Sequence, residues 1–147
     1  MSERPFMLGR AAKLLAGLWA GLLLGLGAIG APAGFAITTV EIAGRTAGRM
    51  FAIEAYVSLA LAVLLLLLTR KAAAASPAGP ALNTNLLLVL GALFCTIVGY
   101  FVMQPLMVAA RAGEGSLSFG ALHGLSAGFF ALKGLLVIAL AWRLTAA

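Results

Sequence analysis

The stretch MFAIEAYVSLALAVLLLLL, residues 50–68, decides the fold class of this chain. It is long enough to cross the roughly 30 Å hydrocarbon core of a membrane as a helix, and Glu54 is its only charged residue. Backbone polar groups in lipid must be satisfied within their own segment, which favours a helix over a strand. The stretch therefore predicts a membrane-spanning helix that carries one carboxylate inside the apolar layer.

Three further apolar runs of similar length give the chain four predicted spans. A hydrophobic content of 63%, a charged content of 10% and a mean hydropathy of +1.12 are typical of polytopic membrane proteins and not of soluble domains. We expect an all-α fold, in which residues 1–147 form a single transmembrane domain, an antiparallel four-helix bundle made of two hairpins. The expected helices cover about residues 14–37, 39–69, 86–109 and 119–143, and a cytoplasmic linker rich in Ala, Ser, Pro and Asn covers residues 70–85.

The formal charge of +6 indicates a membrane orientation and not a nucleic-acid surface, because the basic residues are scattered over loops and helix ends. Basic residues favour the cytoplasmic side of a membrane protein. Both termini are therefore predicted to be cytoplasmic. The predicted inner side holds Arg4, Arg10, Lys13, Arg70, Lys71 and Arg143, and the outer side holds Arg45, Arg49 and Arg111.

The N-terminal region also has an alternative interpretation, as a secretory signal. Basic residues precede an apolar stretch, and Ala31-Pro32-Ala33 has the small-residue form of a cleavage site. The apolar run is unusually long for a signal and continues past that site, which favours a first membrane helix. The mass of the purified protein distinguishes the two interpretations.

Three local patterns predict where helices bend or begin. Pro32 should kink or end the first helix. Thr38 and Glu41 have the spacing of a capping box, with Thr38 as the cap of the second helix. In the third helix Pro105 leaves a backbone carbonyl one turn earlier without its donor, and we expect Gln104 to satisfy such exposed backbone groups.

Small residues recur at every fourth position on three of the four predicted helices. This spacing lets helix backbones approach closely in lipid. We expect these residues to pack the bundle, with homodimerisation as the alternative, and we expect the single cysteine to be a packing residue. They are Gly17, Gly21 and Gly25 in the first helix, Gly91, Cys95 and Gly99 in the third, and Gly120, Gly124 and Gly128 in the fourth.

Glu54, His123 and Lys133 are ionisable residues placed at or inside the apolar layer. Counting along ideal helices puts Glu54 in the outer half, His123 at the outer edge and Lys133 near the middle. Side chains tilt toward the N-terminus of their helix, so Glu54 and Lys133 both lean outward. We therefore predict that Glu54 contacts either Lys133 or His123.

These residues define a candidate polar site in the outer half of the bundle. On a helical wheel Ser126 and Lys133 lie on the side of His123, whereas Leu125, Leu132 and Leu136 lie opposite and should face lipid. Simpler roles are also open: His123 as an interfacial residue bonded to a loop carbonyl, and Lys133 as a snorkelling residue. The full candidate site is Glu54, Gln104, His123, Ser126, Lys133, Arg49 and Arg111.

Three classes of function fit this pattern. The first is a non-enzymatic membrane protein whose polar site serves transport, ion handling or the support of a larger complex. The second is a metal or haem binder, in which His123 joins Met103, Met107 or Cys95 as a copper ligand. The third is a membrane enzyme with Glu54 as proton acceptor and His123 as its partner, although the sequence shows no nucleophile, phosphate loop or metal triad.

Motifs along nearly the whole chain resemble the transmembrane-protein-205-like family. They are APAGF at 31–35, GRTAGRMF at 44–51, QPLM at 104–107 with Arg111, and Phe119 with HGLS at 123–126. The resemblance implies a four-helix membrane protein with these positions gathered toward one side. Together with the compact, Ala-, Gly- and Leu-rich sequence, it predicts the bacterial inner membrane.

The resemblance also bears on ligands. A distant kinship to copper-resistance membrane proteins keeps metal or haem handling open. Eukaryotic members tend to have a polar residue one turn after the histidine motif, where this chain has Phe129 and Phe130. That departure weakens the transfer of a ligand site to this chain.

Overall fold

The computed structural model describes residues 3–74 and 83–146, and its regular elements over those ranges are all helical. Four helical runs are long and apolar enough to cross a membrane, which confirms the predicted fold class. The elements are α1 (Glu3–Leu24), η1 (Gly25–Gly30), α2 (Ala31–Ile37), α3 (Val40–Ala74), α4 (Thr84–Thr96), η2 (Ile97–Val102), α5 (Met103–Arg111) and α6 (Phe119–Ala146), where η1 and η2 are π-helical turns.

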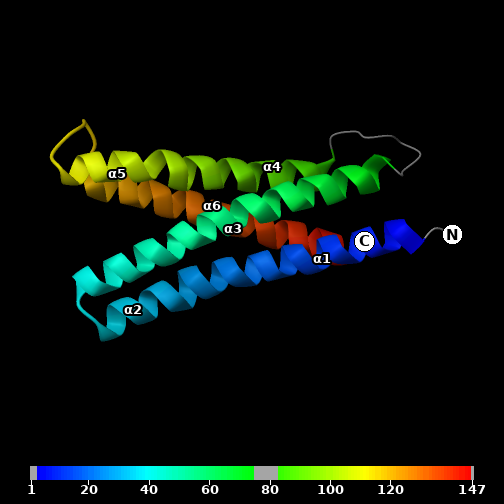
Figure 1. The fold of residues 1–147 in the computed structure, drawn as a ribbon, viewed down its shortest axis with the longest axis horizontal. Helices are drawn as coiled ribbons and strands as arrows, with labels where there is room; N and C mark the ends of the chain where they lie inside the picture. The colour runs from blue at the N-terminus through cyan, green and yellow to red at the C-terminus, as the bar shows by residue number, and fades with distance from the viewer. Residues whose placement is uncertain (1–2, 75–82, 147) are drawn as a thin grey trace.

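The four spans pack side by side with alternating directions (Figure 1). Both α1 and α4 pack on α3 and on α6, so each long helix has two neighbours. The N- and C-termini lie at the same end of the bundle, which we call the termini end (Figure 1). The opposite end, with the turn at Thr38 and Thr39 and the loop at 112–118, is called the loop end.

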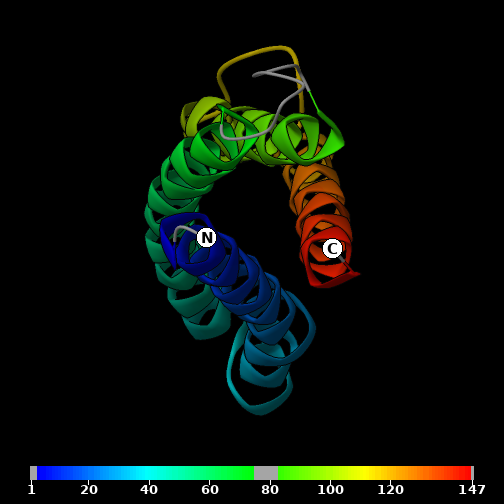
Figure 2. The ribbon, with the colours of Figure 1, turned by 90° about the vertical axis from the view of Figure 1, so that its right-hand side faces the viewer.

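The two helical hairpins separate toward the loop end. At that end α2 packs on α3, and α5 packs on α6. Figures 1 and 2 show that these two helix pairs diverge from each other toward the loop end. The apolar core accordingly lies in the other half of the bundle. Its largest fully buried side chains include Trp19, Leu23, Leu65, Val137 and Leu140.

The prolines of the first and third spans each follow a π-helical turn. Pro32 lies in the first turn of α2, directly after η1, and the chain stays helical to Ile37. Pro105 lies in the first turn of α5, directly after η2. A π-helical turn changes the hydrogen-bond register, which accommodates a residue that lacks a backbone N–H. Pro32 therefore does not end the first helical run.

The start of the second span differs from the predicted capping box. The hydroxyl of Thr38 donates to the Gly34 carbonyl, at 2.9 Å, and so belongs to the end of α2. The hydroxyl of Thr39 accepts from the Ile42 N–H, and Glu41 pairs with Arg45 at the exposed surface. The prediction of Thr38 as the cap was wrong by one residue, because Thr38 closes the preceding helix.

The predicted linker at 70–85 is shorter than expected. Helix α3 continues through Arg70 and Lys71 to Ala74, since alanines and basic residues at a helix C-terminus sustain the helix. At the other side, the Asn83 side chain accepts from the Leu86 N–H at 2.9 Å and caps α4. Residues 75–82 of the predicted linker lie outside the described residues.

The small-residue stripes pack only in part as expected. A Cβ added at Gly91 would lie 3.1 Å from Leu136, and one added at Gly99 would lie 2.5 Å from Phe129, so both glycines sit against α6. The free Cys95 between them is buried. The predicted packing glycines of the first and fourth helices do not lie against a neighbouring helix. An added Cβ would meet no atom of another helix within 4 Å at Gly17, Gly21, Gly25, Gly120, Gly124 or Gly128.

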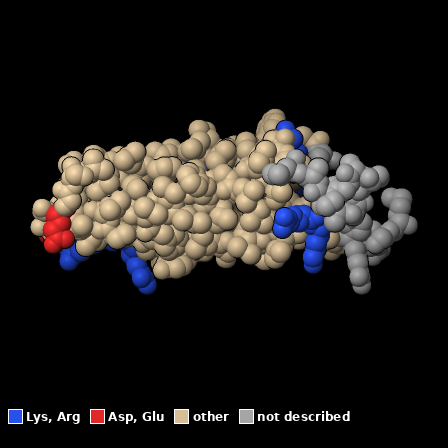
Figure 3. Space-filling view, turned by 90° about the horizontal axis from the view of Figure 1, so that it is seen from above, with Lys and Arg blue, Asp and Glu red and all other residues tan. Residues whose placement is uncertain are grey.

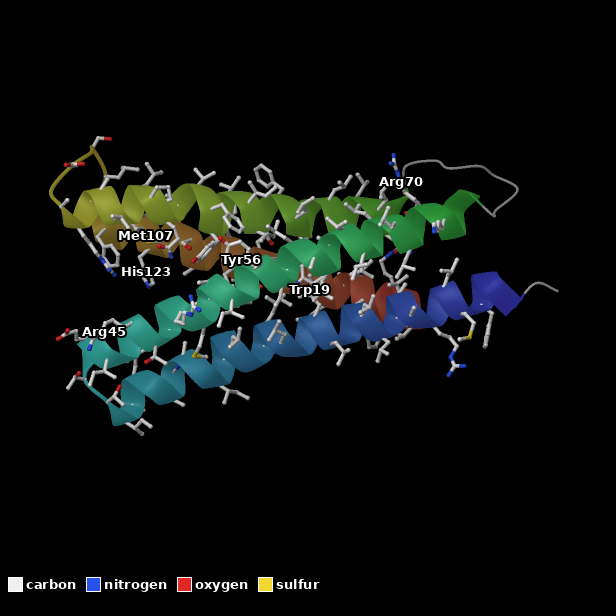
Figure 4. The ribbon with its side chains drawn as sticks, viewed as in Figure 1. Trp19, Arg45, Tyr56, Arg70, Met107 and His123 are labelled. Carbon is white, nitrogen blue, oxygen red and sulfur yellow. The ribbon has the colours of Figure 1, made fainter. Side chains whose placement is uncertain are left out.

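The surface has the layering of a membrane protein. Large apolar side chains such as Ile29, Val63 and Leu135 are exposed along the spans. On the face shown in Figure 3, Lys, Arg, Asp and Glu lie toward the two ends and leave a band without them in between. Figure 4 marks the two ends with Arg45 and Arg70. Such a band is the part of the molecule that a bilayer would cover.

Candidate site at the Glu54–Lys133 pair

A carboxylate and an ammonium group meet inside the apolar layer. Nζ of Lys133 on α6 donates to Oε1 of Glu54 on α3 at 2.7 Å and to Oε2 at 2.9 Å. Their side chains are only 3% and 2% exposed. The predicted contact between Glu54 and Lys133 is therefore present, and it joins the first hairpin to the second.

Two further polar side chains extend this contact across a third helix. Ser58 lies one turn after Glu54 on α3, and its hydroxyl donates to Oε1 of Glu54. The Ser58 hydroxyl in turn accepts from Nε1 of Trp19 on α1 at 2.8 Å. Trp19 lies between α1 and α3 (Figure 4). We call these four residues, Trp19, Ser58, Glu54 and Lys133, the Glu54 network.

The Glu54 network is hydrogen-bonded throughout and closed to its surroundings. Its four residues are at most 3% exposed. Among the described residues, every buried side-chain nitrogen and oxygen has a hydrogen-bond partner. A buried charge without a partner is strongly unfavourable, whereas a paired and hydrogen-bonded one is tolerated. The network is thus a complete polar unit inside an apolar bundle.

Two aromatic rings cover the network toward the loop end. Phe130 precedes Lys133 by one turn of α6, and its ring centroid lies 5.1 Å from Nζ of Lys133. Phe51 packs edge-on against Phe130, with centroids 5.0 Å apart. Gly27 of η1 lies against the same ring, since an added Cβ would come within 2.7 Å of Phe130. We call Phe51 and Phe130 the aromatic cap.

The arrangement permits a simple proton transfer. If one proton moves from Nζ of Lys133 to a carboxylate oxygen of Glu54, the ion pair becomes a neutral amine beside a neutral carboxylic acid. The hydrogen bond between them is kept, and no net charge is gained or lost.

His123 lies elsewhere and contacts a different group. It is exposed and stacks on Phe119, with ring centroids 5.7 Å apart and planes 14° apart. The guanidinium carbon of Arg111 lies 4.3 Å from the centroid of the same Phe119 ring. Among the described side chains, no hydrogen bond joins His123 to Glu54. His123 therefore contacts the first residue of α6, Phe119, and does not belong to the hydrogen-bonded Glu54 network.

The remaining candidate residues make no hydrogen bond to the Glu54 network in the part of the chain that the structure describes. The Ser126 hydroxyl donates to the Gly99 carbonyl in η2 at 2.6 Å, and so ties α6 to the third span. Gln104 is half-buried, and its side chain makes no hydrogen bond to the residues that the structure describes, so the expected capping role is not found. Arg49 is exposed on α3.

The soft ligand candidates differ from His123 in their exposure. Met107 and Cys95 are buried, whereas His123 is exposed. In the described part of the chain, no group of three or more His, Cys, Asp or Glu side chains is close enough to hold a metal ion.

Sequence reasoning missed two members of the Glu54 network, Trp19 and Ser58. One available signal was the spacing of Ser58, which lies four residues after Glu54 and therefore on the same face of α3. Serine and tryptophan are common in membrane helices, so neither residue stands out by type.

Comparison with known families gives one match. Residues 14–116 match DUF4149, a domain of unknown function. The matched range includes Trp19, Glu54 and Ser58, and ends before α6, which supplies Lys133. No curated protein and no solved structure matches the chain. Since the match covers well over half of its length, the chain belongs to the DUF4149 family, a domain of unknown function.

Proposed function

We propose that this protein is a non-enzymatic integral membrane protein that handles protons at the Glu54–Lys133 pair. The observation that carries the proposal is the doubly hydrogen-bonded contact between a buried carboxylate and a buried ammonium group. Ionisable residues inside a membrane are costly, and they commonly mark proton and ion pathways. A purely apolar pair would pack the same helices at lower cost, which argues for a use beyond packing.

The surroundings of the pair favour proton exchange with the loop end. Toward the termini end the pair is backed by Trp19, Ser58 and the apolar core. Toward the loop end the pair lies against the aromatic cap, and the two hairpins separate further along in that direction (Figure 1). A small displacement of the Phe130 ring would therefore expose the pair on that side first.

Proteoliposomes with a trapped pH-sensitive dye test this proposal. A pH gradient is imposed while potassium and valinomycin hold the membrane potential at zero. We expect wild-type protein to dissipate the gradient faster than empty liposomes, and Glu54→Gln to return the rate to that of empty liposomes. Gln keeps the shape of the side chain but has no carboxyl proton to exchange.

The matched control is Glu41→Gln, which removes an exposed carboxylate of the same helix and should leave the rate unchanged. Lys133→Gln is a second variant of the pair, and circular dichroism and gel filtration establish that each variant is folded. A wild-type rate equal to that of empty liposomes would contradict the proposal, as would an undiminished rate in folded Glu54→Gln.

We further propose the bacterial inner membrane as the location, with both termini cytoplasmic. Five basic residues lie toward the helix ends at the termini end, namely Arg10 and Lys13 in α1, Arg70 and Lys71 in α3, and Arg143 in α6. Under the positive-inside rule such an end is cytoplasmic. The motif resemblance to the transmembrane-protein-205-like family supports the same picture of a small multi-pass protein.

Assembly with a second copy or a larger membrane complex is a second proposed role. It is favoured by Gly120, Gly124 and Gly128 of α6, which are exposed and at which an added Cβ would meet no atom of another helix within 4 Å. Light scattering in detergent tests it: we expect a particle heavier than one chain, and a single-chain mass after Gly124→Leu. A single-chain mass for the wild type would contradict it.

A further inference from the structure

A depression with a volume of about 490 Å³ lies on α1 near the termini end. It is lined by Arg10, Lys13, Leu14, Gly17 and Leu18, which share one face of the helix. Among the described residues, those that line it include no carboxylate. The part of the depression nearer the N-terminus, at Arg10 and Lys13, is therefore cationic. The part further along α1 is apolar.

The shape of the depression follows from Gly17. An added Cβ at this position would meet no atom within 4 Å, so the glycine leaves open space between two leucines. Leu14 and Leu18 are 64% and 61% exposed, so they border a slot that the protein itself does not fill. An extended hydrocarbon chain would fit along such a slot, because it needs apolar walls and no hydrogen bonds.

The two cations lie at the depth of lipid headgroups. The first apolar span runs from Phe6 to Ile37, or 32 residues. A helix of that length is about 48 Å long, against a hydrocarbon core of about 30 Å, so its ends extend into the headgroup layers. Arg10 is exposed, and Lys13, one turn further along, is half-buried.

We propose that this depression binds one anionic phospholipid. Its phosphate lies between Arg10 and Lys13, and one acyl chain lies along Leu14, Gly17 and Leu18. The cations match the net negative charge of phosphatidylglycerol or cardiolipin, whereas a zwitterionic lipid would bring its own cation to the same place. The apolar slot that follows the two cations along α1 favours a whole lipid over free phosphate. Free phosphate would leave Leu14 and Leu18 uncovered.

Native mass spectrometry of the full chain, released from equal mixtures of phosphatidylglycerol and phosphatidylcholine, tests the charge requirement. We expect wild-type protein to retain phosphatidylglycerol preferentially. The double variant Arg10→Gln with Lys13→Gln should reduce that preference by about 30-fold, because each cation near a membrane surface raises the affinity for an anionic lipid roughly fivefold. The matched control, Arg70→Gln with Lys71→Gln, removes two exposed cations from the same end and should keep the preference.

A second comparison tests the slot without changing any charge. Gly17→Leu fills the depression and should abolish lipid retention. Gly21→Leu adds the same side chain one turn further along, at an exposed glycine that does not line the depression, and should keep it. Circular dichroism and monodisperse gel filtration are required of each variant before it is compared.

Three results would overturn the proposal. One is equal retention of the two lipids by the wild type, and another is an unchanged preference in Arg10→Gln with Lys13→Gln. The third is displacement of the retained lipid by millimolar inorganic phosphate, which would show a site for a free anion. Because Glu54 is unchanged in all these variants, the outcome is independent of the proposed proton handling.

Discussion

At the scale of single residues, Glu54 and Lys133 depend on each other. Each is buried, and each is the principal charged partner of the other. Removal of one member leaves an uncompensated charge in an apolar region, whereas replacement of both by apolar residues removes the charges altogether. The two single substitutions and the double substitution should therefore be strongly non-additive.

A double-mutant cycle measures that coupling. We expect Glu54→Leu and Lys133→Met each to lower the free energy of unfolding by about 3–5 kcal/mol, and the double variant to lower it by much less than the sum. Unfolding in SDS, followed by circular dichroism, gives the values. Additive effects of the two substitutions would mean that the side chains do not interact in the folded protein.

The contact of Glu54 with Lys133 could be predicted from sequence because it follows from helix direction and side-chain tilt. The sequence also places His123 at the membrane edge, but the contact that it makes there could not be predicted, because a residue at that edge has loop residues and solvent as further partners. It stacks on Phe119 at the start of α6, and the same ring also contacts Arg111 at the end of α5. Neither periodicity nor depth distinguishes that environment from the bundle interior.

At the scale of helices, Gly99 has a different role from the other small residues. It lies in η2, where α6 crosses closely enough for Ser126 to bond its carbonyl and for Phe129 to lie against its Cα. A side chain at this position would push α6 away from the third span. The close approach of these two helices therefore requires a glycine here.

Gly99→Ala should lower the free energy of unfolding by about 1–3 kcal/mol, because the added methyl group would overlap Phe129. Gly134→Ala, in the same helix as Phe129, is the matched control. It adds the same methyl group where nothing lies within 4 Å, and should be neutral or stabilise by up to about 1 kcal/mol. Equal effects of both substitutions in thermal unfolding would contradict the packing described for η2 and α6.

The number and type of the helices could be predicted because apolar length alone determines which segments cross a membrane. Their ends could not be predicted to the residue. Thr38 and Thr39 are both good capping residues, and only the hydrogen bond of Thr38 to Gly34 shows which helix it serves. Glycine spacing likewise shows which residues share a helix face, but not whether that face meets another helix.

At the scale of the whole molecule, the placement of charge distinguishes the two ends. Both termini lie at one end, together with Arg70, and the loop end carries Arg45 (Figures 1 and 4). Lys71 lies in the last turn of α3, at the termini end, and Arg111 ends α5, at the loop end. The apolar band between the ends matches a bilayer in composition. The bundle is packed most tightly near the termini end and separates toward the loop end.

Cysteine labelling tests this orientation. Cys95 is the only cysteine of the chain and is buried, so Cys95→Ala provides a background for single cysteines at exposed Ser116 and Thr145. We expect a membrane-impermeant maleimide to label Ser116→Cys in intact spheroplasts and Thr145→Cys only after lysis. The opposite pattern would reverse the orientation, and labelling of both before lysis would contradict a bundle that spans the membrane.

The central claim is that Glu54 and Lys133 are in contact within a lipid bilayer. Replacement of Lys13 and Lys71 by arginine leaves Lys133 as the only lysine, so solid-state NMR of reconstituted protein with ¹⁵Nζ-lysine and ¹³Cδ-glutamate observes this contact selectively. We expect strong dipolar transfer between the two labels, and its loss in Glu54→Gln. Absence of that transfer in the wild type, or its persistence in Glu54→Gln, would show that the two side chains are not in contact in the bilayer.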